Sequence, residues 1–163
     1  MEVVATVKQK GDPGKALELL KQRLKEAAKY ECAVGFPVDD SGLGTPEPAY
    51  DGHASIIEVA VSNNYGLNVP ERPFMDLAQT LMEGTYGRVM RKLGPKILSG
   101  EAKIEKVLEV AGLEAETDVR DAIDNGGWLP NAPATIKAKG SSKPLIDTAT
   151  MRNRATHVVR VKR

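Results

Sequence analysis

The chain has 163 residues, of which 41% are apolar and 28% are charged, so it is long enough to bury the core of one ordinary domain over 1–163. Apolar residues never run for the roughly 18 to 20 positions that cross a bilayer. A single cysteine, Cys32, excludes an internal disulfide and a cysteine-rich zinc site. The composition therefore excludes membrane-spanning, disulfide-framework and zinc-finger proteins.

The charges are distributed unevenly, although the net charge is only +1 and the chain as a whole does not attract nucleic acid strongly. Residues 137–163 contain eight Lys or Arg and one acid, whereas 39–58 contain five acids and no Lys or Arg. Opposite charges in separate segments are suited to contacts between copies of one chain. Solvation of loops is the commoner cause of such a pattern.

The first elements are predicted by local patterns. Residues 1–8 form a β-prone run that predicts a strand, and 30–36 form a second one. Between them, Leu17, Leu20 and Leu24 recur at helical spacing, and Asp12 before a first-turn proline is suited to cap a helix over 12–28. We expect a surface helix with one buried apolar stripe.

The middle of the chain begins with an arm, 37–52, that is rich in proline and glycine. A short helix over 53–62 is predicted next, and Gly66 is suited to a left-handed cap after it. A long helix should start near 73. Its Gly84 and Gly87 indicate a close contact with another helix, and Gly94 followed by proline should stop or kink it.

Two further helices are predicted, one capped by Ser99 and running to Gly112, the other capped by Thr117 and running to about 125. A second irregular arm occupies 128–150, and 156–162 is β-prone. The prediction is an α+β fold, with a small, mostly antiparallel sheet flanked by helices and two long extended arms at 37–52 and 128–150.

Two candidate binding motifs fail. The segment 11–15 lies between a strand and a helix like a phosphate loop, but Gln9 replaces the first glycine of that motif and Ala16 replaces its Ser or Thr. The acidic arm and the residue after it supply Asp39, Asp40, Asp51 and His53, whose spacing matches no calcium or zinc pattern. We therefore expect no metal and no cofactor.

Catalytic constellations are also missing from the sequence. Cys32 lies in a β-prone run, where a buried thiol is commoner than a nucleophile. His157 stands among Arg152, Arg154 and Arg160, and these charges disfavour the imidazolium that a general base must become. We expect no enzymatic activity.

Two segments resemble a known family. Residues 57–66 read IEVAVSNNYG and 69–74 read VPERPF, which resembles the pattern A-x-x-N-E-[FY]-G … I-P-A-R-P-F of small proteins encoded among the head and tail genes of tailed bacteriophages. Residues 133–148 read PATIKAKGSSKPLIDT, which is similar to P-x-T-x-x-x-K-G-S-x-K-P-L-I-D-T-G of the same family. The order and spacing agree, and the resemblance covers about 56–152. The chain departs from the pattern at Asn64, Glu71 and Ala149.

The family is the neck or tail-completion group of siphophages and myophages, also described as virion morphogenesis proteins. The resemblance implies a non-enzymatic structural subunit, with a small sheet flanked by helices, at the head–tail junction of the virion. It implies a homo-oligomeric ring, commonly six-fold, around the channel that DNA crosses, and contacts with neighbouring connector or tail-terminator proteins. Before assembly the subunit would be in the host cytoplasm.

If the chain is a ring subunit of this kind, several residues are candidates for contacts between subunits. Arg72 is held on a stiff backbone between two prolines and is suited to a bidentate pair with a carboxylate, although its segment could instead only fix the start of the next helix. Leu145 and Ile146 are suited to anchor the second arm across a neighbouring copy, or to pack on their own domain. On the first interpretation, Leu145→Asp would abolish the ring and leave the monomer folded. The candidates are Arg72, Phe74, Lys139, Lys143, Leu145, Ile146, Asp147, Asp39 and Asp40.

The basic terminal strand is a candidate for contact with DNA through Arg160, Lys162 and Arg163, with a purely structural strand as the alternative. A different class of function is also compatible with the sequence. The chain could be a soluble phage-encoded regulator or binding module, acting on a host protein as a monomer or dimer.

Overall fold

A computed structural model of the chain describes residues 12–36, 54–146 and 149–162. The predicted strand over 1–8 and the acidic arm 37–52 lie outside these residues. The described part is α+β, as predicted. Its elements are α1 (Pro13–Ala27), β1 (Tyr30–Gly35), α2 (Ile56–Tyr65), α3 (Phe74–Ser99), α4 (Ile104–Asn125), α5 (Pro133–Lys139), α6 (Thr150–Arg154) and β2 (Thr156–Val161).

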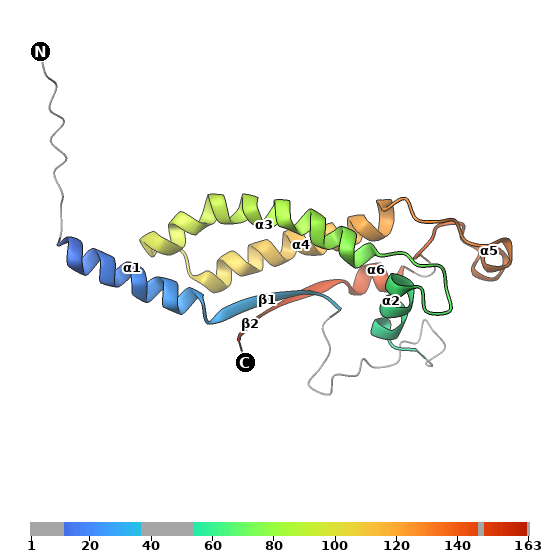
Figure 1. Cartoon of the computed structure of the whole chain (residues 1–163), viewed down its shortest axis with the longest axis horizontal. Helices are drawn as coiled ribbons and strands as arrows, with labels where there is room; N and C mark the ends of the chain where they lie inside the picture. Colours follow the sequence, from blue (N-terminus) through green and yellow to red (C-terminus); the bar gives the residue numbers. More distant parts are fainter. Residues whose placement is uncertain (1–11, 37–53, 147–148, 163) are drawn as a thin grey trace, which may run out of the picture.

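Two long antiparallel helices, α3 and α4, form the body of the molecule (Figure 1). The sheet lies along α4 and consists of β1 and β2, paired antiparallel from Tyr30 opposite Val161 to Gly35 opposite Thr156. The strands come from opposite ends of the chain. α1 extends the molecule beyond the sheet at one end, and α2 and α5 lie at the other (Figure 1).

The helix α4 is continuous, which corrects the prediction of two helices. Ser99 is the last residue of α3 and caps nothing, Lys103 precedes α4, and Thr117 lies inside it. Gly112 does not end the helix. A Cβ built there would lie 2.2 Å from Cδ2 of His157, so this glycine makes room for the imidazole ring.

The helix α3 continues past Gly94 and Pro95 to Ser99, and its last turns bend toward α1 (Figure 1). Because Pro95 lies within the last turns, it removes only one hydrogen bond near the helix end. The predicted close contact at Gly84 and Gly87 is wrong, since a Cβ built at either position would meet nothing within 4 Å.

The chain buries two apolar clusters, one toward each end of the α3–α4 pair. The first contains Phe74 and Ile123, and the ring of Phe36 meets that of Phe74 edge-on at 6.2 Å between centroids. The second contains Val89 and Val107. Both long helices contribute to both clusters, so they connect the two halves of the core.

Two of the predicted helix caps are confirmed. The Asp12 side chain accepts a hydrogen bond from the Gly14 amide at 2.9 Å, and Gly66 ends α2 with φ of 69°. The predicted buried stripe of α1 is wrong, however, because no residue of this helix is buried. The second arm is also less irregular than predicted, since 128–150 contains the helix α5.

Candidate subunit interface

Arg72 holds together two segments that are distant in sequence. Its guanidinium donates to the Leu129 carbonyl oxygen at 3.3 Å and 3.4 Å, and to Asn131 Oδ1 at 3.0 Å. A further bond, of 3.4 Å, goes to Oδ1 of Asn63 in α2. Only 5% of Arg72 is exposed. We call this set of contacts the Arg72 clip.

The clip corrects the prediction of a carboxylate partner, because every acceptor of the Arg72 side chain that the structure gives is a neutral amide or carbonyl oxygen. Burial therefore lowers the pKa of the Arg72 guanidinium. The backbone of Arg72 also contributes to the clip, since its amide donates to the Asn63 carbonyl oxygen at 2.8 Å. The segment fixes the start of α3, which was the alternative interpretation.

Asn131 extends the clip to the second arm. Its Nδ2 donates to the carbonyl oxygen of Lys143 at 3.2 Å, and its side chain is buried. The segments 57–74 and 133–148 are therefore connected through one arginine and one asparagine. Asn64, also buried, accepts from the Met75 amide at 2.9 Å, which satisfies a free donor in the first turn of α3.

Phe74 and Leu145 lie in the first apolar cluster and not at the surface. Phe74 is 0% exposed and Leu145 is 7% exposed, and Ile146 packs against the same cluster. These side chains have almost no surface to offer another copy. We therefore expect Leu145→Asp to destabilise the monomer instead of leaving it folded, because the substitution places a carboxylate in the core.

The charged interface candidates are less constrained by the structure. Lys143 is exposed, whereas the side chain of Lys139 and all of Asp147, Asp39 and Asp40 lie outside the described part of the chain. Arg163 also lies outside it. Lys162 is exposed, and Arg160 Nε pairs with Glu31 Oε1 at 2.7 Å across the sheet.

His157 lies next to two carboxylates in the structure, although its charged neighbours in the sequence are arginines. Its Nδ1 lies 2.7 Å from Glu116 Oε1 and its Nε2 lies 3.1 Å from Glu109 Oε2, both on α4. Because carboxylates only accept, both contacts are satisfied when the ring carries both protons. Desolvation lowers the pKa of His157, but the hydrogen bonds to Glu116 and Glu109 outweigh it and leave the pKa raised.

Glu116 gathers most of the polar contacts between α4 and β2. It accepts from the Thr156 hydroxyl at 3.0 Å, from the His157 amide at 3.1 Å and from Arg120 at 3.0 Å. Burial acts to raise the pKa of Glu116, but the bonds from His157 and Thr156 and the charge of Arg120 lower it on balance. These contacts of Glu116 with Thr156 and His157 hold β2 against α4, and we call them the joint at His157.

The described residues contain no arrangement suited to metal binding or thiol chemistry. No group of three or more His, Cys, Asp or Glu residues among them could hold a metal ion. Burial raises the pKa of the Cys32 thiol, which keeps it protonated and a poor nucleophile. None of the described helices combines the length and apolar content needed to span a bilayer.

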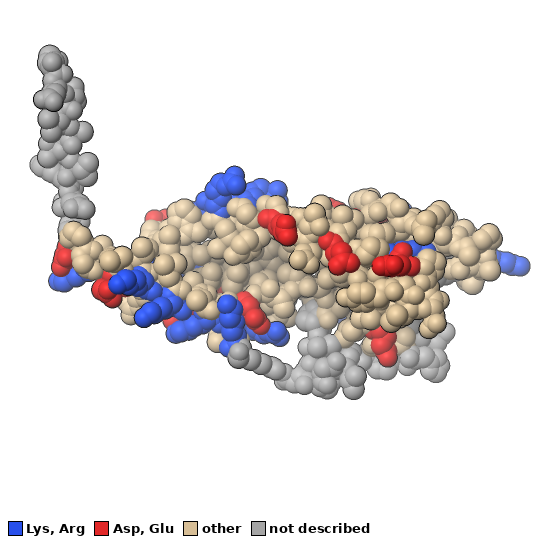
Figure 2. Space-filling view, in the orientation of Figure 1, with Lys and Arg blue, Asp and Glu red and all other residues tan. Residues whose placement is uncertain are grey.

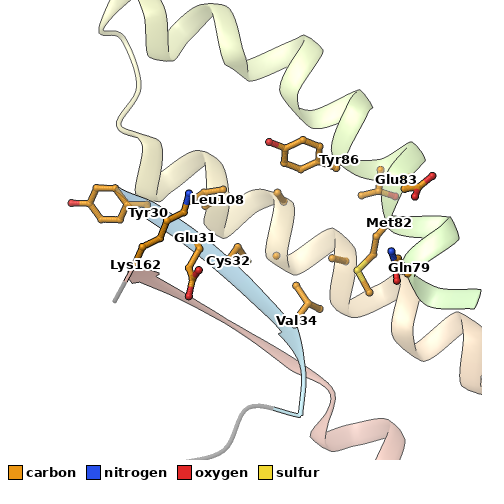
Figure 3. Close-up of a pocket in the computed structure, with 14 residues that line it drawn as sticks. Tyr30, Glu31, Cys32, Val34, Gln79, Met82, Glu83, Tyr86, Leu108 and Lys162 are labelled. Atoms are coloured by element: carbon orange, nitrogen blue, oxygen red, sulfur yellow. The ribbon is translucent and has the colours of Figure 1, made fainter. Parts of the chain in front are cut away.

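The surface has two apolar features that the sequence analysis did not find. A groove of about 470 Å³ lies between β1 and α3, with α4 as its floor (Figure 3). Its walls include Tyr30 and Val34 from the strand and Met82 and Tyr86 from the helix. The second feature is α1, where Leu17 and Leu24 are each 51% exposed. The groove is formed by three elements and leaves no local signal in the sequence, whereas α1 was predicted as a surface helix whose apolar stripe the structure does not bury.

No protein-family model, curated protein or solved structure matches the chain.

Proposed function

We propose that the chain is a structural protein of the head–tail junction of a tailed bacteriophage. It is a neck or tail-completion subunit that assembles as a ring, expected to be six-fold, around the channel that DNA crosses. Its neighbours would be connector and tail-terminator proteins. The virion neck is its expected location after assembly.

The observation that carries this proposal is the contact between the two segments on which the family resemblance rests. Arg72 of the first segment binds Asn131, 59 positions away, and Asn131 in turn binds the Lys143 carbonyl oxygen of the second segment. Patterns that coincide by chance have no reason to meet in the fold. Through the clip, the arginine of the first pattern fixes the position of Leu129 and Asn131, which come just before the second pattern.

Two of the three departures from the family pattern leave the contacts of the two segments intact, whereas the third, Ala149, has a φ of 60°, a conformation that favours the glycine of the pattern. Asn64 replaces the usual acid, but its side-chain oxygen still accepts a hydrogen bond from the start of α3. Glu71 replaces a small residue and is exposed, so its side chain needs no space in the core. Neither change disturbs the contacts that the two segments make.

Apolar surface near the clip supports self-association or docking on a neighbouring protein. Tyr65 and Leu129 are each 66% exposed, and Leu67 is 51% exposed. Leu129 is the residue whose carbonyl the clip holds, so its exposed side chain is presented on a fixed backbone. We assign these exposed side chains to contacts with other subunits.

Contact with DNA is the part of the proposal that depends on the terminal strand. Exposed Lys162 and the basic end of the chain could meet phosphates, although Arg160 already pairs with Glu31. Salt-sensitive binding of duplex DNA should weaken when Arg160, Lys162 and Arg163 are replaced by Ser. Binding that is absent from the assembled ring would leave β2 as a purely structural strand.

The test of the proposed function is quantitative mass spectrometry of purified virions, with copies of this chain counted against the portal protein. A copy number near half that of the portal supports a six-fold ring, and parity supports a twelve-fold one. Absence from the particle would contradict the proposal. The regulator of a host protein would then be the better interpretation.

A further inference from the structure

The helix α1 presents an apolar face that its own subunit does not bury. Leu17 and Leu24 lie seven positions apart, so they share one face and are separated by roughly 10 Å. Half of each side chain is exposed. A helix of 15 residues is marginally stable alone in water, so this face needs cover from elsewhere.

The groove beside β1 has the dimensions of such a helix face. Its α3 wall runs from Gln79 to Tyr86 and its α4 floor from Leu108 to Ala115, each also seven positions and roughly 10 Å long. The floor is formed largely by the small residues Ala111, Gly112 and Ala115, which lets a side chain descend between the taller walls. Figure 3 shows Met82 and Tyr86 projecting from α3 above the strand residues.

The helix cannot fill the groove of its own chain. Only Ala28 and Lys29 connect α1 to β1, and the helix points away from the groove beyond the end of the sheet (Figure 1). Arg23 also fixes α1 to the far end of α3 by donating to the Leu98 carbonyl oxygen. An α1 helix that fills this groove must therefore belong to another copy.

Charge favours α1 of a second copy as that occupant. The helix carries four basic residues and two acidic ones, and Figure 2 shows Lys and Arg gathered over it. The groove has Glu83 on its α3 wall, whereas Glu31 on its β1 wall is already paired with Arg160 at 2.7 Å and Lys162 lies at one end. A basic helix with an apolar face thus meets an apolar groove whose α3 wall carries the carboxylate of Glu83.

We propose that α1 of one copy docks its Leu17 and Leu24 face into the β1–α3–α4 groove of the next copy. The two surfaces differ, so the contact is heterologous and repeats from copy to copy until the assembly closes. This inference rests on the self-association included in the proposed function. It adds to that function which surfaces of two neighbouring copies are in contact.

The native Cys32 lines the groove and is the only cysteine of the chain, which gives a direct test. In Leu17→Cys, a short bismaleimide should join the introduced thiol of one copy to Cys32 of the next, at a mildly alkaline pH that offsets the raised pKa of Cys32 and with mass spectrometry to show that Cys32 has reacted. Because each copy then carries one reactive group on each surface, a denaturing gel should show a ladder of dimers, trimers and larger species. Adding Cys32→Ser to this variant should abolish every species above the dimer.

Leu19→Cys is the matched control. Leu19 is 46% exposed on the same helix, but two positions from Leu17 it lies about 160° around the axis. It should give no ladder. Equal ladders from the two variants, or a ladder from neither, would overturn the proposed contact.

A second readout avoids chemical cross-linking. In light scattering, the double variant Leu17→Asp and Leu24→Asp should lose the assembled species and give the mass of one chain, 17.6 kDa, whereas Leu19→Asp should assemble like the wild type. Assembly of the double variant at wild-type strength would overturn the contact. An edge-to-edge pairing of β1 strands would produce that result.

The two proposals can fail separately. A ladder from Leu17→Cys together with absence of the chain from virions would contradict the phage function and keep the contact. Presence in virions at a ring copy number, with no ladder, would contradict the contact and keep the function.

Discussion

Arg72 connects α2, the start of α3 and the second arm through neutral oxygen acceptors in a buried site. Arg72→Lys keeps the charge but removes the planar fork that reaches several acceptors at once. We expect the free energy of unfolding to fall by about 2–3 kcal/mol, because buried oxygens of Leu129 and Asn131 lose their donor. Urea unfolding followed by the fluorescence of Trp128 measures the change.

The control for this prediction is Arg91→Lys on α3, where the side chain is exposed. Its effect should stay within about 0.5 kcal/mol. Equal midpoints for the two variants would show that the clip contributes nothing particular to stability.

The joint at His157 predicts a dependence of stability on pH. Because the folded state raises the pKa of His157 above its ordinary 6.5, folding favours the protonated ring. That stabilisation is complete below pH 6.5 and is lost as the pH rises through the raised value. Glu116 acts in the opposite sense, since its lowered pKa gives stability that is lost only in acid.

The measurement is the free energy of unfolding at a series of pH values from 5 upward, for the wild type and for His157→Gln. The wild type should lose stability through the neutral range, and the variant should lack that part of the loss. The comparison also separates His157 from His53, which both proteins retain. Parallel curves would contradict a raised pKa at His157.

At the scale of elements, the two long helices contain glycines with opposite predicted effects. At Gly112 a Cβ would lie 2.2 Å from the His157 ring, so Gly112→Ala should destabilise the chain by about 1–3 kcal/mol despite the better helix propensity of alanine. At Gly84 nothing lies within 4 Å, so Gly84→Ala should stabilise it by up to about 1 kcal/mol. Thermal unfolding of the two variants at one pH tests both signs, and a shared sign would contradict the structure.

Local signals in the sequence were sufficient for the elements that they define. Asp12 before a proline and Gly66 after an apolar stripe act within a few residues of themselves, and both caps formed as predicted. Two β-prone runs likewise predicted the strands β1 and β2, although not their pairing with each other. Such features depend on backbone and side-chain preferences that a short window contains.

Predictions are wrong where the role of a residue depends on contact with residues that are distant in sequence. The sequence alone predicts that Gly112 ends a helix, because the His157 ring that packs against it is distant in sequence. His157 is surrounded by arginines along the chain but by Glu109 and Glu116 in space. Arg72 finds amide oxygens in place of a carboxylate, and Leu145 packs inside its own domain, because the second arm folds back onto α2 and α3.

The described part of the molecule has two apolar clusters but only one pair of long helices, and both clusters are built on that pair. Ile97 belongs to the cluster near α1, whereas Trp128, the only tryptophan, packs on the cluster near α2 and donates to the Ala122 carbonyl at 2.9 Å. Because α3 and α4 pass through both clusters, loss of one removes the helices that build the other. The described part of the chain should therefore unfold as a unit.

Ile97→Ala tests this cooperativity, since it removes apolar volume from the cluster that does not contain the tryptophan. We expect a loss of about 2–3 kcal/mol, toward the low end for such substitutions because Ile97 is 8% exposed and alanine favours the helix. Urea unfolding at one protein concentration should show the same midpoint shift in Trp128 fluorescence and in far-ultraviolet circular dichroism. A shift in dichroism without one in fluorescence would mean that the two clusters unfold separately and that the long helices do not couple the ends of the molecule.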